Sequence, residues 1–184
     1  MKKRIRIHIG GLYASKGSAV IETTLGSCVA VCLFDPVERI GGMNHILLPG
    51  KADLKHFDTL ARYGINAMEL LINRITALGG NRARLVAKAF GGAHILPAIS
   101  LNKGMGRKNT EFVLEFLKME GISLVSQNLG GHSTRKLCFH TDTGYAFLKT
   151  LPHATRPSLI SWELKQWDRV RSNAEKAGEI TLFS

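Results

Sequence analysis

The sequence predicts a mixed α/β domain in which strands pack in two layers and two main helices cover one side. Short segments rich in Val, Ile and Thr are separated by Gly and Pro, which is typical of strands, and two longer segments carry apolar residues at helical spacing. The chain has 184 residues. This length fits one domain and is enough to bury a substantial core.

The first part of the chain predicts strands only. Residues 5–9 alternate apolar and polar side chains, as a strand does and an export signal does not. Segments 19–24, 27–34 and 40–48 follow, and together they predict a β-meander. Gly41-Gly42, inside the last of these segments, indicates a bulge or a close approach of another backbone.

The middle of the chain predicts the two main helices with a strand between them. Residues 57–78 carry apolar side chains at helical spacing and are followed by Gly79-Gly80, a common helix stop. Residues 85–90 predict a strand. Residues 110–119 predict the second helix, with Asn109 as its N-cap.

Three further strands are predicted at residues 122–126, 135–140 and 145–149, of which the last two form a hairpin. The predicted core ends shortly after them. We therefore expect one domain at residues 1–152.

Residues 153–184 are predicted to form a C-terminal extension with an amphipathic helix over 161–177 and a short tail. In the simpler interpretation Trp162 and Trp167 pack this helix on the core. In the alternative, residues 180–183 at a free end add to a sheet edge or groove of a partner.

Composition restricts the possible partners. The formal net charge of +11 and the isoelectric point near 9.9 favour acidic partners. The Lys and Arg residues are scattered and aromatic residues make up only 7% of the chain, so we expect no nucleic-acid binding.

The longest apolar run is far short of the ~20 residues that span a bilayer, so we expect no membrane insertion. Three cysteines do not suggest a disulfide framework and are typical of a reducing cytoplasm.

Cys28 and His45 are the residues best suited to carry chemistry. They lie on adjacent predicted strands, which is the layout of a cysteine nucleophile with its base. A thiol with an unperturbed pKa of about 8.5 is mostly protonated at neutral pH, and a nearby imidazole can take its proton. The alternative is that Cys28 is a small buried core residue, the commonest role of a free cysteine.

The sequence gives weaker evidence for a metal site or an anion-binding site. In a strand, Cys28 and Cys32 share a face but are roughly 13 Å apart, whereas zinc bonds are about 2.0–2.3 Å long, so we expect no metal site. Residues 104–109 combine glycines and basic side chains ahead of a helix and could hold an anion. They lack the complete dinucleotide and P-loop patterns, so a loop that caps the helix is the favoured interpretation.

Several motifs follow one another in order along about residues 4–150. They are Leu25-Gly26-Ser27-Cys28-Val29-Ala30-Val31, Asp35-Pro36, Gly41-Gly42, His45-Ile46-Leu47-Leu48-Pro49, Ala87-Lys88-Ala89-Phe90-Gly91-Gly92-Ala93, Gly106-Arg107-Lys108-Asn109 and Gly130-Gly131-His132-Ser133-Thr134-Arg135-Lys136. Together they resemble the CheD family, the chemoreceptor glutamine deamidases of bacterial chemotaxis. The resemblance also implies a likeness in fold to the catalytic domains of cytotoxic necrotising factor toxins, which are cysteine deamidases.

The resemblance implies that Cys28 is the nucleophile and His45 its base. The third catalytic residue of the family is a threonine six positions before the cysteine, where this chain has Glu22. Thr24 lies two residues further on and, in a regular strand, would point to the same side as Cys28. Either Thr24 completes the site or Glu22 orients His45 as a carboxylate does in other triads. Backbone amides around Gly26 and Ser27 are expected to stabilise the oxyanion.

The implied reaction converts receptor glutamines to glutamates through a thioester, with glutamyl methyl esters as possible further substrates and with no cofactor. The implied partners are the cytoplasmic domain of a chemoreceptor and a CheC-type phosphatase. Because Glu22 departs from the family pattern, a non-enzymatic adaptor that binds receptors or the phosphatase is the alternative.

Overall fold

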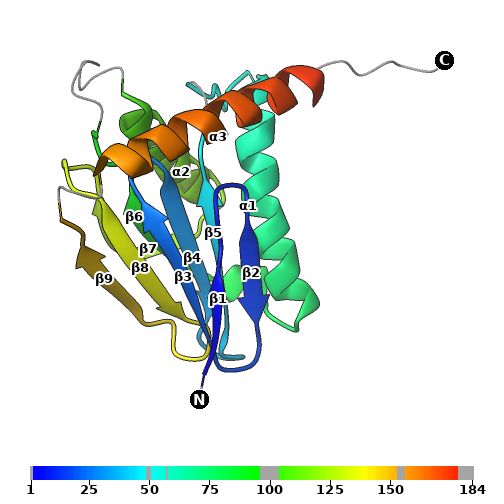
Figure 1. Ribbon diagram of the computed structural model, residues 1–184. Helices are drawn as coiled ribbons and strands as arrows, with labels where there is room; N and C mark the ends of the chain where they lie inside the picture. Colours follow the sequence, from blue (N-terminus) through cyan, green and yellow to red (C-terminus); the bar gives the residue numbers. More distant parts are fainter. Residues whose placement is uncertain (1, 49–50, 57, 96–103, 153–155, 178–184) are drawn as a thin grey trace.

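A computed structural model describes residues 2–48, 51–56, 58–95, 104–152 and 156–177 of the chain (Figure 1). The strands are β1 (Lys3–Arg6), β2 (Leu12–Ser15), β3 (Ala19–Leu25), β4 (Val29–Asp35), β5 (Ile40–Ile46), β6 (Val86–Gly91), β7 (Ser123–Leu129), β8 (Arg135–His140) and β9 (Ala146–Thr150). The helices are α1 (Thr59–Ala77), α2 (Met105–Met119) and α3 (Arg156–Ala177), with a short 3-10 helix at Arg82–Arg84.

The strands form two sheets. One has the order β1-β3-β8-β9 and the other β2-β5-β4-β6-β7. Strand pairs β1/β3 and β6/β7 are parallel, and the remaining neighbours are antiparallel. The predicted meander of three strands is therefore wrong in one respect, because β3 and β4 belong to different sheets. The chain changes sheets at residues 26–28, between these two strands.

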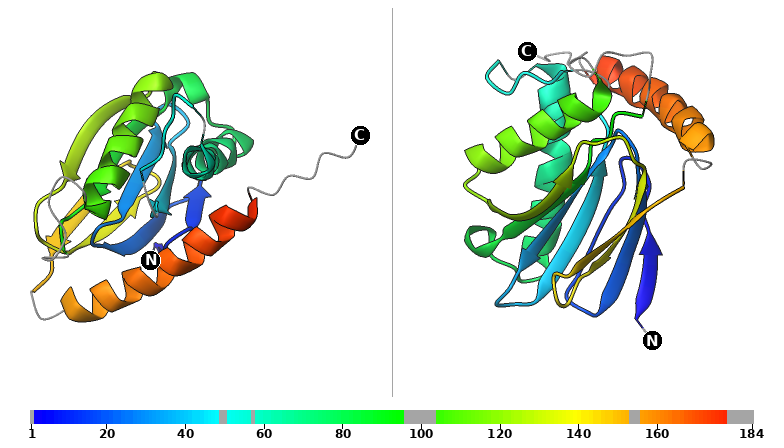
Figure 2. Two further views of the ribbon diagram at one scale, coloured as in Figure 1. Left: turned by 90° about the horizontal axis from the view of Figure 1, so that it is seen from above. Right: turned by 90° about the vertical axis from the view of Figure 1, so that its left-hand side faces the viewer.

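Two apolar clusters confirm the predicted layers. One lies between the two sheets and includes Ile21, Leu25, Met43 and Phe139. The other lies between the five-stranded sheet and the helices α1 and α2. Figure 2 shows both helices on the same side of the sheets. The predicted class, a two-layered β core with two main helices on one side, is confirmed.

Helix α1 begins close to the predicted residue. Asp58 is its N-cap and accepts a hydrogen bond from the backbone amide of Ala61 at 2.7 Å. In the middle of the helix, Gly64 allows close contact with α2, since a Cβ at this position would lie 2.4 Å from the Phe112 ring. The two helices therefore pack closely at this glycine.

Helix α2 begins earlier than predicted, and Asn109 is not its N-cap. Gly104 occupies the cap and residues 105–109 are helical, so this segment is not the anion-binding or capping loop considered above. Asn109 is fully buried. Its Oδ1 accepts from the backbone N–H of Leu48 at 2.7 Å and its Nδ2 donates to the Ser27 carbonyl at 3.1 Å. The side-chain amide of Asn109 is therefore bonded to other segments and is not used to cap the helix.

Gly41-Gly42 belongs to an uninterrupted pairing of β5 with β2 and β4, so the close approach is confirmed rather than the bulge. A Cβ at Gly41 would lie 2.7 Å from the Thr141 carbonyl oxygen. At Gly42 it would lie 2.7 Å from the Ala14 Cβ. The predicted hairpin of β8 and β9 is also present.

Helix α3 crosses the molecule at the end opposite the N-terminus (Figure 1). It begins five residues earlier than predicted, at Arg156 instead of residue 161. The expected packing on the core is confirmed, because Trp167 packs against the cluster between the sheets and the Trp162 ring lies 5.9 Å from that of His8. The predicted tail at residues 180–183 lies outside the described residues. Within the described part of the chain, no helix is long and apolar enough to cross a membrane.

Candidate active site

Cys28 and His45 face the same space between the two sheets. Ala30, two residues after Cys28, pairs directly with His45 across β4 and β5. Cys28 and Ala30 belong to the apolar cluster between the sheets, as do Met43 and Leu47, the residues two before and two after His45. Because alternate residues of a strand share a face, the His45 imidazole points into the same layer as the Cys28 thiol.

The Cys28 thiol is closed off from solvent. Its residue is fully buried, and its Sγ donates a hydrogen bond to the Oε1 atom of Glu163 at 3.1 Å. Burial, together with the negative charge and hydrogen bond of Glu163, raises the pKa of Cys28 well above its ordinary value. In this arrangement the thiol is protonated at neutral pH.

Glu163 extends from α3 into the turn between β3 and β4 and is 2% exposed. The backbone N–H of Gly26 and that of Ser27 each donate to its carboxylate at 3.1 Å, and the Ser27 hydroxyl donates at 2.6 Å. Gly26 is needed for this contact, since a Cβ there would lie 2.6 Å from Oε1. The donors expected from sequence to stabilise an oxyanion thus surround a carboxylate.

The carbonyl groups of the same turn are all hydrogen-bonded to the scaffold. Gly26 O accepts from Ala93 N at 2.7 Å, Ser27 O accepts from Asn109 Nδ2 at 3.1 Å, and Cys28 O accepts from Gly92 N at 2.7 Å. With its carbonyls held in this way, the turn presents its amide N–H groups toward Glu163.

His45 is held by a residue that sequence reasoning did not select. Its Nδ1 lies 2.8 Å from the Thr23 hydroxyl, which in turn donates to the Ile7 carbonyl at 3.0 Å. Because the hydroxyl proton is used on Ile7, Thr23 accepts the Nδ1 proton of His45. The Nε2 atom is then the unprotonated nitrogen, and it is buried without a hydrogen-bond partner among the described residues.

The imidazole of His45 is neutral. Burial, with a contribution from the charge of His8, lowers its pKa from 6.5 to about 3. A neutral imidazole with a free Nε2 is the form that can accept a proton from a thiol.

The structure corrects both proposals for the third residue. Thr24 follows Thr23 in β3, so its side chain points to the opposite face, away from His45. The expectation that it shares a side with Cys28 was wrong, because the chain changes sheets between them and strand alternation is lost. Glu22 does not orient His45 either. It is ion-paired with Arg4 and Lys136.

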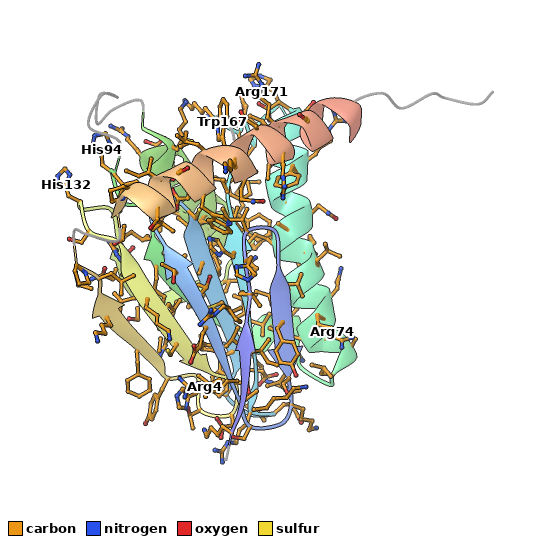
Figure 3. All side chains as sticks on the ribbon, viewed as in Figure 1. Arg4, Arg74, His94, His132, Trp167 and Arg171 are labelled. Atoms are coloured by element: carbon orange, nitrogen blue, oxygen red, sulfur yellow. The ribbon has the colours of Figure 1, made fainter. Side chains whose placement is uncertain are left out.

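The ion pairs of Glu22 lie on the face of β3 opposite to the side chain of Thr23. Burial opposes its ionisation, but hydrogen bonds from Lys136 and Arg4 outweigh this effect and lower the pKa of Glu22. Arg4 lies toward the end of the molecule remote from α3 (Figure 3). Glu22 therefore stabilises the four-stranded sheet and has no contact with the thiol or the imidazole.

The family described as CheD chemotactic sensory transduction matches residues 47–150 of the chain. The chain is 41% identical to a probable chemoreceptor glutamine deamidase CheD of Vibrio vulnificus strain YJ016, over 97% of this chain and 86% of that protein. The chain belongs to the CheD family. The chain is also 38% identical to a probable chemoreceptor glutamine deamidase CheD 1 of Shewanella oneidensis, over 99% of this chain and 88% of that protein. It is 44% identical to a probable chemoreceptor glutamine deamidase CheD of Stenotrophomonas maltophilia strain K279a, over 90% of this chain and 82% of that protein.

These alignments correct the extent of the resemblance. Sequence motifs placed its end near residue 150, but the alignments with the Vibrio vulnificus and Shewanella relatives cover nearly the whole of this CheD chain and so include most of α3. The segment that carries Glu163 therefore has a counterpart in these relatives. A signal for Glu163 was present in the sequence, because positions 163, 167 and 170 share one helix face and the other two are Trp and Val.

This CheD chain has a second polar cluster beside the loop that follows β6. His94 and His132 meet edge to face with ring centroids 5.8 Å apart (Figure 3). They line a cavity of about 310 Å³ together with Arg107 and Thr110. Among the described residues, no group of three or more His, Cys, Asp or Glu side chains is arranged to hold a metal ion.

Proposed function

We propose that this CheD chain hydrolyses the side-chain amide of glutamines in the cytoplasmic domain of chemoreceptors. The observation that carries the proposal is a buried thiol that shares the inter-sheet space with a neutral imidazole and lies beside three aimed hydrogen-bond donors. The names of the relatives, probable chemoreceptor glutamine deamidases, support the choice of substrate. Cys28 is the nucleophile and His45 the general base.

The reaction begins when Nε2 of His45 takes the proton of the Cys28 thiol. The thiolate attacks the side-chain carbonyl carbon of the glutamine, and the carbonyl oxygen becomes an oxyanion. The N–H groups of Gly26 and Ser27 and the Ser27 hydroxyl supply the donors for this oxyanion. Such donors typically contribute ~10²–10³ each to the rate.

The second half of the reaction releases the two products. His45 returns its proton to the departing nitrogen, the carbon–nitrogen bond breaks, and ammonia leaves a thioester on Cys28. His45 then takes a proton from water, which attacks the thioester and yields glutamate and the free thiol. A glutamyl methyl ester can follow the same route with methanol as the leaving group.

Thr23 is the positioning residue of the proposed site. By accepting the Nδ1 proton it selects the tautomer in which Nε2 is the base. This role replaces the one that sequence reasoning gave to Thr24 or Glu22.

The cellular setting follows from the same proposal. The three cysteines of the chain are all free thiols, which supports a location in the reducing cytoplasm. We include a CheC-type phosphatase as a second partner on the basis of the family resemblance.

The direct test incubates the protein with a purified receptor cytoplasmic fragment and follows glutamine-to-glutamate conversion by mass spectrometry. We expect conversion with the wild type and none with Cys28→Ala. Cys32→Ala is the matched control, because Cys32 is also a buried cysteine of the inter-sheet cluster and should retain activity. Conversion that persists in Cys28→Ala would disprove the cysteine mechanism, and a fragment that binds without conversion by the wild type would favour the adaptor function.

A further inference from the structure

The carboxylate of Glu163 occupies the place that a substrate side chain needs. Its oxygens accept from the two turn amides and from the Ser27 hydroxyl, and Oε1 lies 3.1 Å from the Cys28 Sγ. These are the donors assigned above to the oxyanion. A receptor glutamine cannot use them while Glu163 is in place.

Glu163 has the same side chain as the product of the proposed reaction. The product of glutamine deamidation is a glutamate side chain, and Glu163 is a glutamate presented to the nucleophile by an α-helix. A carboxylate beside the thiol also opposes thiolate formation, so it does not suit an activating role. Cys28, His45 and Glu163 are each no more than 2% exposed, and a substrate reaches them only if a covering element moves.

We propose that α3 is a built-in product mimic, which places Glu163 in the pocket that receives the side chain of a helix-borne substrate glutamine and keeps the site closed until α3 is displaced. The inference rests on the proposed function for the identity of the nucleophile. It adds the binding position of the substrate amide, the helical presentation of the substrate, and competition between the substrate helix and α3.

The packing of α3 suits a cover that can be exchanged. Glu163 and Val170 are its buried residues among those whose side chains are described, and Leu164 is 42% exposed. Trp167 contacts the cluster between the sheets but is only partly buried, so Glu163 and its donors make the main buried polar contact of α3. A helix that offers a glutamine to the same pocket can replace the contacts of Oε1, because its amide oxygen accepts hydrogen bonds from the turn N–H groups, while its NH2 group can donate to the Ser27 hydroxyl oxygen.

The first test turns residue 163 into a substrate. In Glu163→Gln the amide oxygen can take the place of Oε1, and the Cys28 thiolate attacks the amide carbon of residue 163. Ammonia leaves, the resulting thioester links Cys28 to α3, and water hydrolyses it to restore glutamate and the thiol. Intact-peptide mass spectrometry of the purified variant should show residue 163 converted to glutamate.

Two controls accompany this test. Gln166, on the same helix three residues away, reports spontaneous or unspecific deamidation and should stay glutamine. The double variant Glu163→Gln with Cys28→Ala should keep glutamine at residue 163. A residue 163 that stays glutamine in the single variant, or that converts equally in the double variant, would overturn the assignment of the pocket.

The second test measures closure with a receptor fragment as substrate. We expect Glu163→Ala to raise kcat/KM by about tenfold, since a closed site lowers the apparent affinity by the fraction of open molecules. Asp168→Ala is the matched control, because Asp168 is an acidic residue of the same helix outside the buried site. Circular dichroism verifies the fold of each variant.

The two tests separate the inference from the proposed function. Receptor conversion at equal rates by the wild type and Glu163→Ala, with residue 163 unconverted in Glu163→Gln, would overturn the inference and leave the function standing. Conversion of residue 163 in Glu163→Gln, with no conversion of the receptor fragment by any variant, would support the pocket and contradict the proposed substrate.

Discussion

Replacement of Thr23 by Val gives the sharpest test of the proposed site. The two side chains have nearly the same shape, so the exchange removes the hydroxyl and little else. The hydroxyl makes two buried hydrogen bonds, one from His45 Nδ1 at 2.8 Å and one to the Ile7 carbonyl at 3.0 Å. Both partners are left unsatisfied in the variant.

The magnitude follows from these two hydrogen bonds. A buried polar group without a partner costs about 1–3 kcal/mol of folding free energy. The imidazole is also free to place its proton on Nε2, the atom that must accept the proton of Cys28. If about 1.4–2.8 kcal/mol of the transition-state stabilisation is lost, kcat falls by about 10- to 100-fold. KM should change little, because Thr23 lies behind the imidazole in the proposed mechanism and has no contact with the substrate.

Steady-state deamidation of a receptor fragment measures the effect, with ammonia release as the readout. Thr23→Ser keeps the hydroxyl and should restore most of kcat. Thr24→Val makes the same chemical change one residue further on, at a side chain on the opposite face of β3, and should leave kcat unchanged. An equal loss in both valine variants, or full activity in Thr23→Val, would refute the assignment of Thr23.

Two further predictions concern stability. The pKa of His45 is about 3 in the folded protein and about 6.5 in an unfolded chain, so the unfolded state binds the proton first as the pH falls. Stability is therefore lost on acidification between about pH 6.5 and 3, by up to about 1.4 kcal/mol per pH unit; urea unfolding of wild type and His45→Gln should show the shallower pH dependence in the variant, and parallel curves would contradict the burial of a neutral imidazole. Gly64→Ala should destabilise the fold by about 1–3 kcal/mol because its Cβ meets the Phe112 ring at 2.4 Å, although helix propensity alone predicts a gain. Phe112→Leu in the same chain should recover part of the loss, and a stabilised Gly64→Ala would show that the helices are less closely packed.

The Cys28 and His45 pair could be predicted from sequence because it depends on local information. Both residues lie in or next to short strands with clear breaks between them, and adjacent antiparallel strands bring the two side chains into one layer. Thr23 could not be predicted in the same way. To place Thr24 beside Cys28, side chains must alternate along one continuous strand that contains both residues. The chain instead changes sheets at residues 26–28, and a change of sheet does not preserve the alternation.

Glu163 illustrates a second limit of sequence reasoning. It lies 135 residues from Cys28 along the chain, and the two meet only because α3 folds back across the end of the sheets. An acidic residue in a charged helix is usually solvated, and only its position on the face of Trp167 and Val170 indicated otherwise. The prediction that Asn109 caps a helix was wrong for a related reason. Asparagine is a common N-cap, but the side-chain amide of Asn109 is hydrogen-bonded to the backbone of two other segments.

Cys28, the proposed nucleophile, lies at the change of sheets, and this location explains why the adjoining turn can bind an oxygen anion. Residues within a strand use their N–H groups to pair with the neighbouring strands, whereas Gly26 and Ser27 lie between β3 and β4 and donate theirs to the Glu163 carboxylate. The carbonyls of residues 26–28 are bound by the backbone of residues 92–93 and by the Asn109 side chain, so the turn cannot rotate to exchange donors for acceptors. Gly91 makes this contact possible, since its φ is +114° and a Cβ there would lie 2.1 Å from the Cys28 carbonyl oxygen. Donors fixed in this way need no reorganisation when charge develops, which is the main source of oxyanion stabilisation. The same fixed donors bind the carboxylate that the chain's own helix α3 presents.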